Sequence, residues 1–291
     1  MKKTTLILIG IIALYGLATL TVPMIVDNHM NGVEHPGPYS VSDQAKDLYN
    51  NLDFVGDLHC DALLWDRNLL SKNPHGQVDI PRMQQGNVAL QAFTIVTKSP
   101  RGQNMDENTG QSDNITPLMI LQGRSMETWV SLYERAKEQC RALHNFATES
   151  DDKFRVIHNQ MELAALINDR KSDPMLVGGF LGVEGAHCLE GNIAYVDSLY
   201  NAGVRMMGPT HFFDNELGGS AHGISNSGLT AFGKQVVKRM DELGMIIDLA
   251  HSSPAIIDDV LSLATKPVLT SHTGVQGILN SKRHLSDDHI R

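Results

Sequence analysis

A histidine and an aspartate stand two positions apart directly after a short apolar run, at a spacing that suits a pair of metal ligands. The run is Phe54 to Leu58, and His59 and Asp61 follow it. On a β-strand, residues i and i+2 point to the same side, so these two side chains would converge on one point. Divalent metals favour such imidazole and carboxylate pairs. Taken alone, a strand end with a capping aspartate and an incidental histidine explains the pair equally well.

More carboxylate and imidazole side chains stand at the ends of later strand-like segments. They are Glu184, His211, His251 and His272. Each has an ordinary alternative, such as capping a helix or bonding to a backbone carbonyl. The ordinary explanation would have to hold at every strand end, so the coincidence favours a shared site. In a (β/α) barrel, the carboxyl ends of the strands form the face where active sites are built.

The predicted ligand set contains three imidazoles and two carboxylates, with no thiolate required. It consists of His59, Asp61, Glu184, His251 and His272. Such a set suits a pair of divalent ions, most naturally Zn²⁺, with one carboxylate bridging them. Two ions held in this way can bind a hydroxide at neutral pH and polarise a carbonyl group. The implied chemistry is hydrolysis of an amide or a related bond.

The elements that would position these residues alternate between strands and helices. Apolar and β-branched runs predict strands at residues 54–58, 88–96, 175–183, 204–208, 245–249 and 267–270. Three-to-four spacing of apolar residues predicts helices at 41–51, 115–149, 160–170, 193–201, 230–243 and 254–264, with a short one at 79–86. This alternation predicts about six right-handed βαβ units around a parallel sheet.

The N-terminal segment differs in kind from the rest of the chain. Residues 6–26 are apolar and uncharged, and Lys2 and Lys3 precede them. About 20 apolar residues span a hydrocarbon core of about 30 Å, so residues 1–26 are predicted to be an uncleaved signal anchor. A cleaved signal peptide, giving a secreted protein, is the close alternative, and a buried core helix is a third. With the lysines cytoplasmic, the body would lie on the periplasmic or extracellular side. Residues 27–41 are expected to be a linker and 42–291 the catalytic domain.

Composition excludes some classes of partner. The chain has 291 residues and a net charge of −9, without a dense block of lysine and arginine, so nucleic acid is not an expected partner. The spacing of Cys60, Cys140 and Cys188 fits neither a zinc knuckle nor a disulfide framework.

Four motifs follow one another along the chain: Gly56-Asp57-Leu58-His59-Cys60-Asp61, Gly182-Val183-Glu184-Gly185-Ala186-His187, Asp248-Leu249-Ala250-His251 and Ser271-His272-Thr273. In sequence and order they resemble those of the membrane dipeptidase (renal dipeptidase) family, peptidase family M19, within the amidohydrolase-like metal-dependent hydrolases. The match runs from about residue 42 to the end of the chain. The resemblance implies a (β/α)8 TIM-like barrel that hydrolyses dipeptides with two zinc ions and a metal-bridging hydroxide, and it allows a homodimer.

The resemblance also assigns roles to the predicted ligands. His59 and Asp61 would bind one zinc ion. His251 and His272 would bind the second, and Glu184 would bridge the two ions. Asp57, which belongs to the same motif as His59, is expected to orient that histidine rather than to bind metal.

Two further residues gain a substrate role from the resemblance. His211 matches the family histidine that sits over the scissile carbonyl and stabilises the tetrahedral oxyanion, so it is both a catalytic and a substrate-binding residue. Arg283 matches the arginine that pairs with the substrate carboxylate, for which a guanidinium fork is well suited. Without the resemblance, Arg283 reads as a solvated surface charge.

The chain also departs from the family pattern. The family carries an aspartate on a further strand near its C-terminus, and Asp287 and Asp288 are not that residue. Two strands of an eight-stranded barrel are also unaccounted for, so we expect a barrel that is truncated at the C-terminus. Two alternatives stay open: another hydrolysis of the amidohydrolase type, on a lactam, lactone or phosphoester, and an inactive metal-binding fragment.

Overall fold

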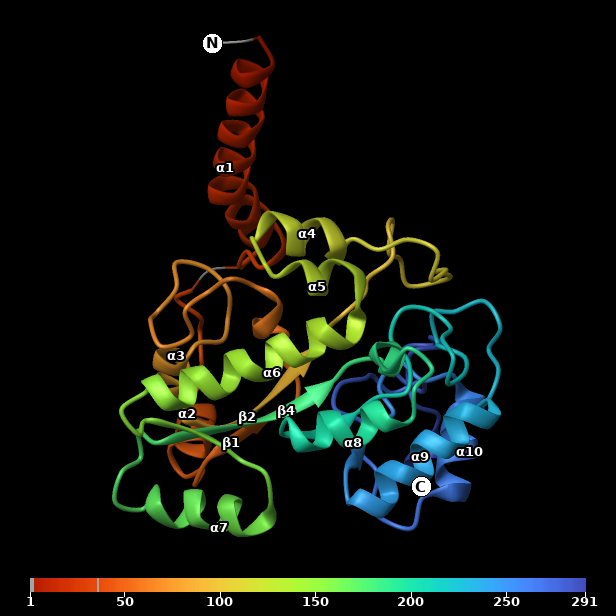
Figure 1. The fold of residues 1–291 in the computed structure, drawn as a ribbon. Coiled ribbons are helices and arrows are strands. Elements are labelled where there is room, and N and C mark those ends of the chain that lie inside the picture. Colours follow the sequence, from red (N-terminus) through yellow and green to blue (C-terminus); the bar gives the residue numbers. More distant parts are fainter. Residues whose placement is uncertain (1–2, 36) are drawn as a thin grey trace.

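A parallel sheet runs through the centre of the computed structural model, which describes residues 3–35 and 37–291 (Figure 1). Residues 1, 2 and 36, which belong to the predicted anchor and linker, lie outside the described residues. The strands of the sheet are β1 (Val55–Asp57), β2 (Val88–Ile95), β3 (Phe154–Val156), β4 (Val177–Val183), β5 (Val204–Met207) and β6 (Ile246–Ile247). Their order is β1-β2-β4-β5-β6, with β3 beside the first half of β4. Every pairing is parallel, so the predicted α/β class is confirmed as an open half-barrel sheet.

Alternate residues of the strands face two different layers. On β2 and β4, Phe93 and Leu181 belong to the large outer core. Their neighbours Ala92 and Phe180 belong to a smaller inner core, together with Leu166. This alternation follows from the period of two in an extended strand. The inner layer continues into an open apolar groove of about 340 Å³ beside Phe180.

Helices cover the two faces of the sheet unequally. The outer core includes residues from α6 (Leu132–Glu149), α8 (Ala194–Asn201), α9 (Ala231–Leu243) and α10 (Pro254–Leu263). On the other side of the strands lies α7 (Gln160–Asp169), which supplies Leu166 to the inner core (Figure 1). The shorter helices are α2 (Asp43–Asn50), α3 (Ile80–Gln85) and α11 (Asp287–Ile290), and 3₁₀ turns occur at η1 (Ala62–Leu64) and η2 (Ala186–Leu189).

Glycines on β4 allow both layers to approach the strand closely. A Cβ atom at Gly179 would lie 2.6 Å from Cε2 of Phe93. A Cβ atom at Gly178 would lie 2.5 Å from Cδ2 of Leu166, on the inner side. Protein interiors are packed to crystal-like density, so these positions have no room for a side chain.

The predicted helix over residues 115–149 is wrong, because the segment forms three helices. These are α4 (Ile115–Leu121), α5 (Met126–Val130) and α6. Gly123 has a φ of +66°, which a helix cannot accommodate. Ser131 is extended, with φ −117° and ψ 125°, and its hydroxyl accepts from the backbone N–H of Glu134 as the N-cap of α6. Apolar periodicity continues across both breaks, which is why the pattern suggested one helix.

Two strand predictions also differ from the structure. Residues 267–270 form no strand; their only ladder contact among the described residues is an isolated parallel bridge between Asp248 and Leu269. Conversely, β3 was not predicted. Its three residues are too few to show alternation, and its pairing with β4 creates it.

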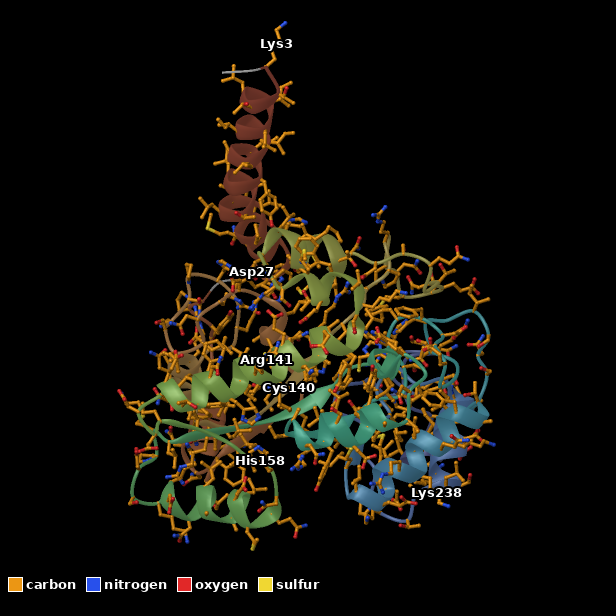
Figure 2. All side chains as sticks on the ribbon, in the orientation of Figure 1. Lys3, Asp27, Cys140, Arg141, His158 and Lys238 are labelled. Atoms are coloured by element: carbon orange, nitrogen blue, oxygen red, sulfur yellow. The ribbon has the colours of Figure 1, made fainter. Side chains whose placement is uncertain are left out.

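The apolar N-terminal segment is a single helix, α1 (Lys3–Met30), that rises from the body (Figures 1 and 2). It is long and apolar enough to cross a membrane by length and composition. The helix contacts α4. At its base Asp27 is only 5% exposed.

Candidate metal centre

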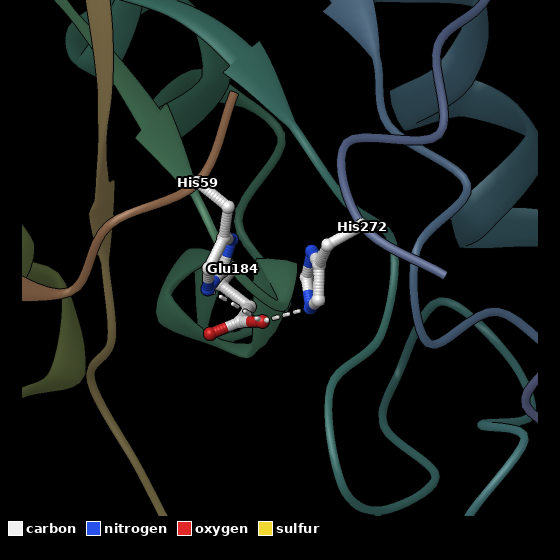
Figure 3. A group of neighbouring side chains, drawn as sticks. All are labelled: His59, Glu184 and His272. Atoms are coloured by element: carbon white, nitrogen blue, oxygen red, sulfur yellow. Dashed lines mark ion pairs between the residues drawn. The ribbon is translucent and has the colours of Figure 1, made fainter. Parts of the chain in front are cut away.

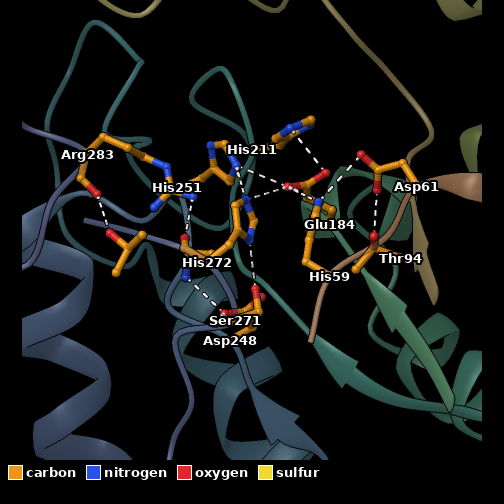
Figure 4. Close-up of polar contacts among 12 residues, drawn as sticks. His59, Asp61, Thr94, Glu184, His211, Asp248, His251, Ser271, His272 and Arg283 are labelled. Carbon is orange, nitrogen blue, oxygen red and sulfur yellow. Dashed lines mark hydrogen bonds and ion pairs between the residues drawn. The ribbon is translucent and has the colours of Figure 1, made fainter. Parts of the chain in front are cut away.

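The predicted ligands come together at the carboxyl ends of the strands (Figure 4). His59 and Asp61 follow β1, and Glu184 directly follows β4. His211 lies beyond β5 and His251 beyond β6. His272 lies three residues after the bridge at Leu269. A parallel sheet brings the ends of its strands to one edge, so residues far apart in sequence can share a site.

Glu184 occupies the centre of the cluster, and four imidazoles surround its carboxylate. Its Oε1 atom lies 3.0 Å from Nε2 of His251, 3.3 Å from Nε2 of His272 and 3.6 Å from Nε2 of His59. Its Oε2 atom lies 3.3 Å from Nε2 of His211. Figure 3 shows the carboxylate between His59 and His272. The Glu184 side chain is only 6% exposed, so its charge is stabilised by these neighbours rather than by water.

Asp61 lies on the open side of the cluster. Its Oδ2 atom is 3.5 Å from Nε2 of His59. Its Oδ1 atom accepts a hydrogen bond of 2.6 Å from the hydroxyl of Thr94, the penultimate residue of β2. The Asp61 side chain is 36% exposed, in contrast to Glu184. Thr94 therefore fixes one carboxylate oxygen and leaves the other directed toward His59.

Asp57 was expected to orient the His59 side chain, but its contact is with the backbone of that residue. Its Oδ1 atom accepts from the backbone N–H of His59 at 3.1 Å. The Nδ1 atom of the His59 ring is buried, and no hydrogen-bond partner for it is present among the described residues. Asp57 therefore positions the chain at His59 rather than the imidazole itself.

His251 is held in a left-handed conformation, with a φ of +62°. This region is costly for a residue other than glycine and persists only where the surroundings enforce it. The carbonyl of His251 accepts from the backbone N–H of Ala221 at 2.8 Å. It also accepts from the hydroxyls of Thr210 at 3.2 Å and Ser220 at 3.3 Å. These three donors turn the backbone so that the ring reaches Glu184.

A chain of side chains fixes the ring of His272 (Figure 4). The hydroxyl of Ser271 donates to Oδ2 of Asp248 at 2.6 Å and lies 2.9 Å from Nδ1 of His272. Because this hydroxyl gives its proton to the carboxylate, it accepts from Nδ1–H of the imidazole. The Nε2 atom of His272 then carries a lone pair directed at the cluster, which is the form that binds a metal.

Burial and charge act in opposite directions on the pKa values of the cluster. Burial alone would raise the pKa of Glu184, but the charge of His211 and the hydrogen bonds from His251 and His272 hold it well below its usual value. Burial lowers the pKa of His251 and of His211. For His59, burial is outweighed by the hydrogen bond to Asp61 and the charge of Glu184, which raise its pKa to about 9. The buried Glu184 side chain therefore stays a carboxylate, and its negative charge favours a cation bound among these residues.

The donor atoms fit metal ions. Each of two groups, His59–Glu184–His272 and Glu184–His211–His251, places three potential ligand atoms within 4.8 Å of one another. Buried Oε2 of Glu184 has no hydrogen-bond partner in the described part of the chain. Imidazole nitrogens and carboxylate oxygens are typical ligands of Zn²⁺. The two groups share Glu184, and the Nε2 atoms of His251 and His272, which the sequence predicted to bind the same ion, also lie 3.0 Å apart.

Arg283 also lies at the cluster, and not on the open surface. Its Nη2 group donates to the carbonyl of His272 at 2.7 Å, and its own carbonyl accepts from the hydroxyl of Thr273 at 2.8 Å. Burial lowers the pKa of its guanidinium from the ordinary value. A partly buried guanidinium beside His272 is available for an anionic group.

Sequence reasoning missed His222, which is fully buried next to the cluster. Its ring stacks on Phe212 at 4.7 Å and lies 5.2 Å from the ring of His251. Its Nδ1 atom is 3.0 Å from the carbonyl of Met105, in the polar loop over residues 99–114. His222 thus connects that loop to the site. His222 does not directly follow a strand in the sequence, so the strand-end argument could not find it.

Comparison with known proteins gives a consistent result. A sequence model of the family described as Membrane dipeptidase (Peptidase family M19) matches residues 42–291. The chain is 25% identical over 224 residues to an uncharacterized dipeptidase of Schizosaccharomyces pombe. That alignment covers 76% of this chain and 50% of the yeast protein. The chain therefore spans about half the length of this curated relative.

Solved structures share the fold. The probable dipeptidase PvdM from Pseudomonas aeruginosa matches with a TM-score of 0.68 at 19% identity, covering 85% of this chain and 58% of that one. A metallo peptidase from Rhodobacter sphaeroides, solved with a phosphinate mimic of the dipeptide L-Ala-D-Ala, matches with a TM-score of 0.61 at 21% identity. That match covers 81% of this chain and 70% of the other. The half-barrel sheet is consistent with the TIM-like barrel of these proteins.

Proposed function

The chain belongs to the membrane dipeptidase family, peptidase family M19, and on that premise we propose that it hydrolyses dipeptides with the help of two Zn²⁺ ions. The observation that carries the proposal is the convergence of four imidazole Nε2 atoms on the buried carboxylate of Glu184. A structural ion pair would need one such partner. A cluster this rich in imidazoles is a typical metal-binding arrangement.

Five side chains would hold the ions: His59, Asp61, Glu184 as the bridge, His251 and His272. Bound zinc supplies Lewis acidity and lowers the pKa of bound water to about 7. The protein's part is to orient the ligands. Ser271 does this for His272, and Thr94 does it for Asp61.

His211 is proposed to stabilise the oxyanion that forms when the peptide carbonyl is attacked. Burial lowers its pKa, which favours the neutral imidazole. With the proton on Nε2, which lies 3.3 Å from Oε2 of Glu184, the ring presents an N–H donor to the substrate side of the cluster. A preorganised donor in a site shielded from water is worth about 2.7–4 kcal/mol of transition-state stabilisation.

Arg283 is proposed to recognise the free carboxylate of the substrate. One of its N–H groups is used by the carbonyl of His272, and its remaining donors can form the two parallel bonds that a carboxylate accepts. Recognition of a terminal carboxylate so near the metals would limit substrates to short peptides.

The proposed location is a membrane with the catalytic body on its periplasmic or extracellular face. The support is α1, whose apolar residues are exposed and whose mean hydropathy reaches 2.3. A signal peptide passes the same test, and N-terminal sequencing of the mature protein separates the two.

The test is hydrolysis by the full chain supplied with Zn²⁺, on dipeptides of both stereochemistries, the same dipeptides amidated at the C-terminus, and a lactone. We expect cleavage of free dipeptides only. Arg283→Ala should lower kcat/KM by about 10–100-fold. This is the loss expected when a hydrogen bond to a charged group, worth about 1.5–3 kcal/mol, is removed. Arg291→Ala, which changes an exposed arginine, is the control. Equal cleavage of free and amidated dipeptides would exclude the role of Arg283, and lactone cleavage alone would exclude the dipeptidase.

A further inference from the structure

The part of α1 from Tyr15 to Asp27 is attached to the body, which limits how much of the helix is free to cross a bilayer. The hydroxyl of Tyr15, near the middle of α1, donates to the carbonyl of Ile120 in α4 at 2.9 Å. From Lys3 to Tyr15 the helix is roughly 18 Å long at about 1.5 Å per residue. A hydrocarbon core is about 30 Å thick, so this free part is too short to span it.

The base of α1 marks the other limit. Asp27 is 5% exposed, and its Oδ2 atom lies 2.9 Å from Nε2 of His75 and 3.3 Å from Nε of Arg67. Its Oδ1 atom accepts from Asn31 at 2.7 Å. Such a polar cluster is costly in hydrocarbon and belongs at or outside the interface. The segment between Tyr15 and Asp27 must therefore enter the membrane for α1 to span it.

Exposed apolar side chains lie on α5, the helix that follows α4. On α5, which follows α4 after a short turn, Met126 is 72% exposed and Val130 is 84% exposed. Trp129 lies between them and packs partly against the small core formed with Ile115. Figure 1 shows α4 crossing the base of α1, with α5 close to it. Met126 and Val130 thus expose apolar side chains on the helix next to α4, which itself contacts α1.

We propose that α4 and α5 lie in the interfacial region of the bilayer beside α1. This inference rests on the proposed membrane anchor. Amphipathic elements of this kind bury their apolar side about 5–10 Å into the boundary between headgroups and acyl chains. With α1 locked to the body through Asp27, the two helices hold the catalytic body against the membrane in one orientation.

The experiment labels one introduced cysteine at a time in the full chain, reconstituted in phosphatidylcholine vesicles. The variants are Met126→Cys and Val130→Cys, with Met161→Cys on α7 as the matched control, since Met161 is 80% exposed. Cys140 and Cys188 are buried and Cys60 is partly buried, so the native thiols react slowly. Each variant carries an environment-sensitive fluorophore, and a second set of vesicles contains lipid brominated in the upper acyl chain.

The proposal expects labels at residues 126 and 130 to emit at shorter wavelength and to be quenched by the brominated lipid. The label at residue 161 should show neither effect. If the labels at residues 126 and 130 behave like the label at residue 161 while the chain floats with the vesicles, the interfacial placement is wrong and the anchor stands. If the chain does not float with the vesicles, anchor and placement both fail. Dipeptide turnover in the same vesicles reports separately on the proposed enzymatic function.

Discussion

The Nε2 atoms of His251 and His272 lie 3.0 Å apart. Two imidazole lone pairs repel at this distance unless a proton or a cation lies between them. Ser271 uses the Nδ1 proton of His272, which leaves a lone pair on Nε2. Burial favours the neutral form of His251 by lowering its pKa. The arrangement is therefore most stable with a positive ion shared between the rings.

Glu184→Gln should abolish tight zinc binding. The amide removes the charge to which four imidazoles are directed, so the loss should exceed the roughly 10–100-fold typical of a residue that only orients a ligand. Equilibrium dialysis followed by metal analysis gives zinc per chain. Glu216→Gln, on an exposed side chain, is the control and should bind as the unmodified chain does. Undiminished zinc in Glu184→Gln would exclude this cluster as the metal centre.

Zinc should also raise thermal stability, because an ion that binds only the folded chain shifts the unfolding equilibrium. At a free concentration 100 times the Kd, the gain is about 2.7 kcal/mol. Differential scanning calorimetry with zinc and with a chelator measures it. The difference should vanish in Glu184→Gln and persist in Glu216→Gln. A gain of equal size in both variants would point to zinc bound elsewhere.

Ser271→Ala should weaken zinc binding by roughly 10–100-fold without unfolding the chain. The variant removes the acceptor for Nδ1–H of His272, and the ring then loses its fixed tautomer and orientation. Competition with a chromophoric chelator gives the affinity. Ser262→Ala, which removes an exposed helical hydroxyl, is the matched control. If Ser271→Ala binds zinc normally, the hydroxyl does not orient the ligand.

Asp113→Asn should lower stability at neutral pH by about 1.5–3 kcal/mol, the usual value for a hydrogen bond to a charged group. The Asp113 carboxylate accepts from the buried guanidinium of Arg135 at 2.7 Å. Burial alone would raise the pKa of Asp113, but the hydrogen bonds from Arg135 and Thr116 outweigh it and lower the pKa. This contribution is therefore fully present above the unfolded pKa of about 3.9 and is lost as the pH falls through the lower folded value.

Urea unfolding at several pH values measures this effect. The gap between the original chain and Asp113→Asn should be constant from about pH 5 upward and should narrow below about pH 4. Asp258→Asn, at an exposed carboxylate, should show no comparable gap. A gap that stays unchanged in acid would mean that the ion pair with Arg135 does not contribute.

Gly179→Ala should destabilise the protein by about 1–3 kcal/mol through overpacking. The new methyl group would lie 2.6 Å from Phe93 and 2.7 Å from Phe154, so both rings would have to move. Gly56→Ala on β1 is the matched control, because a Cβ atom there has no neighbour within 4 Å among the described residues. Chemical denaturation of both variants compares them, and equal stability would show that the two rings have room to adjust.

The sequence indicated the strand-end ligands because their signal is local. His59 and Asp61 follow an apolar run, and Glu184 ends one. By contrast, the role of Ser271 depends on Asp248, which reaches it only after the strands have assembled. Arg283 had no local signal and was found through the family resemblance alone.

The fold could be predicted to a similar degree, for a related reason. The long apolar strands β2 and β4 were found because their patterns are complete within a few residues. The strand β3 exists only through pairing with β4, and no window of sequence contains that information. The breaks at Gly123 and Ser131 depend on backbone angles that apolar periodicity does not report.

The glycines of β4 also affect the unfolded state of the chain. Glycine gives the unfolded chain more conformations than any other residue, and folding must overcome that entropy. Replacing a glycine with alanine normally reduces this cost, but at Gly178 and Gly179 the packed side chains leave no room for the methyl group. The strand that presents Glu184 therefore carries a fixed entropic cost, and the stability that offsets it must come from other parts of the chain.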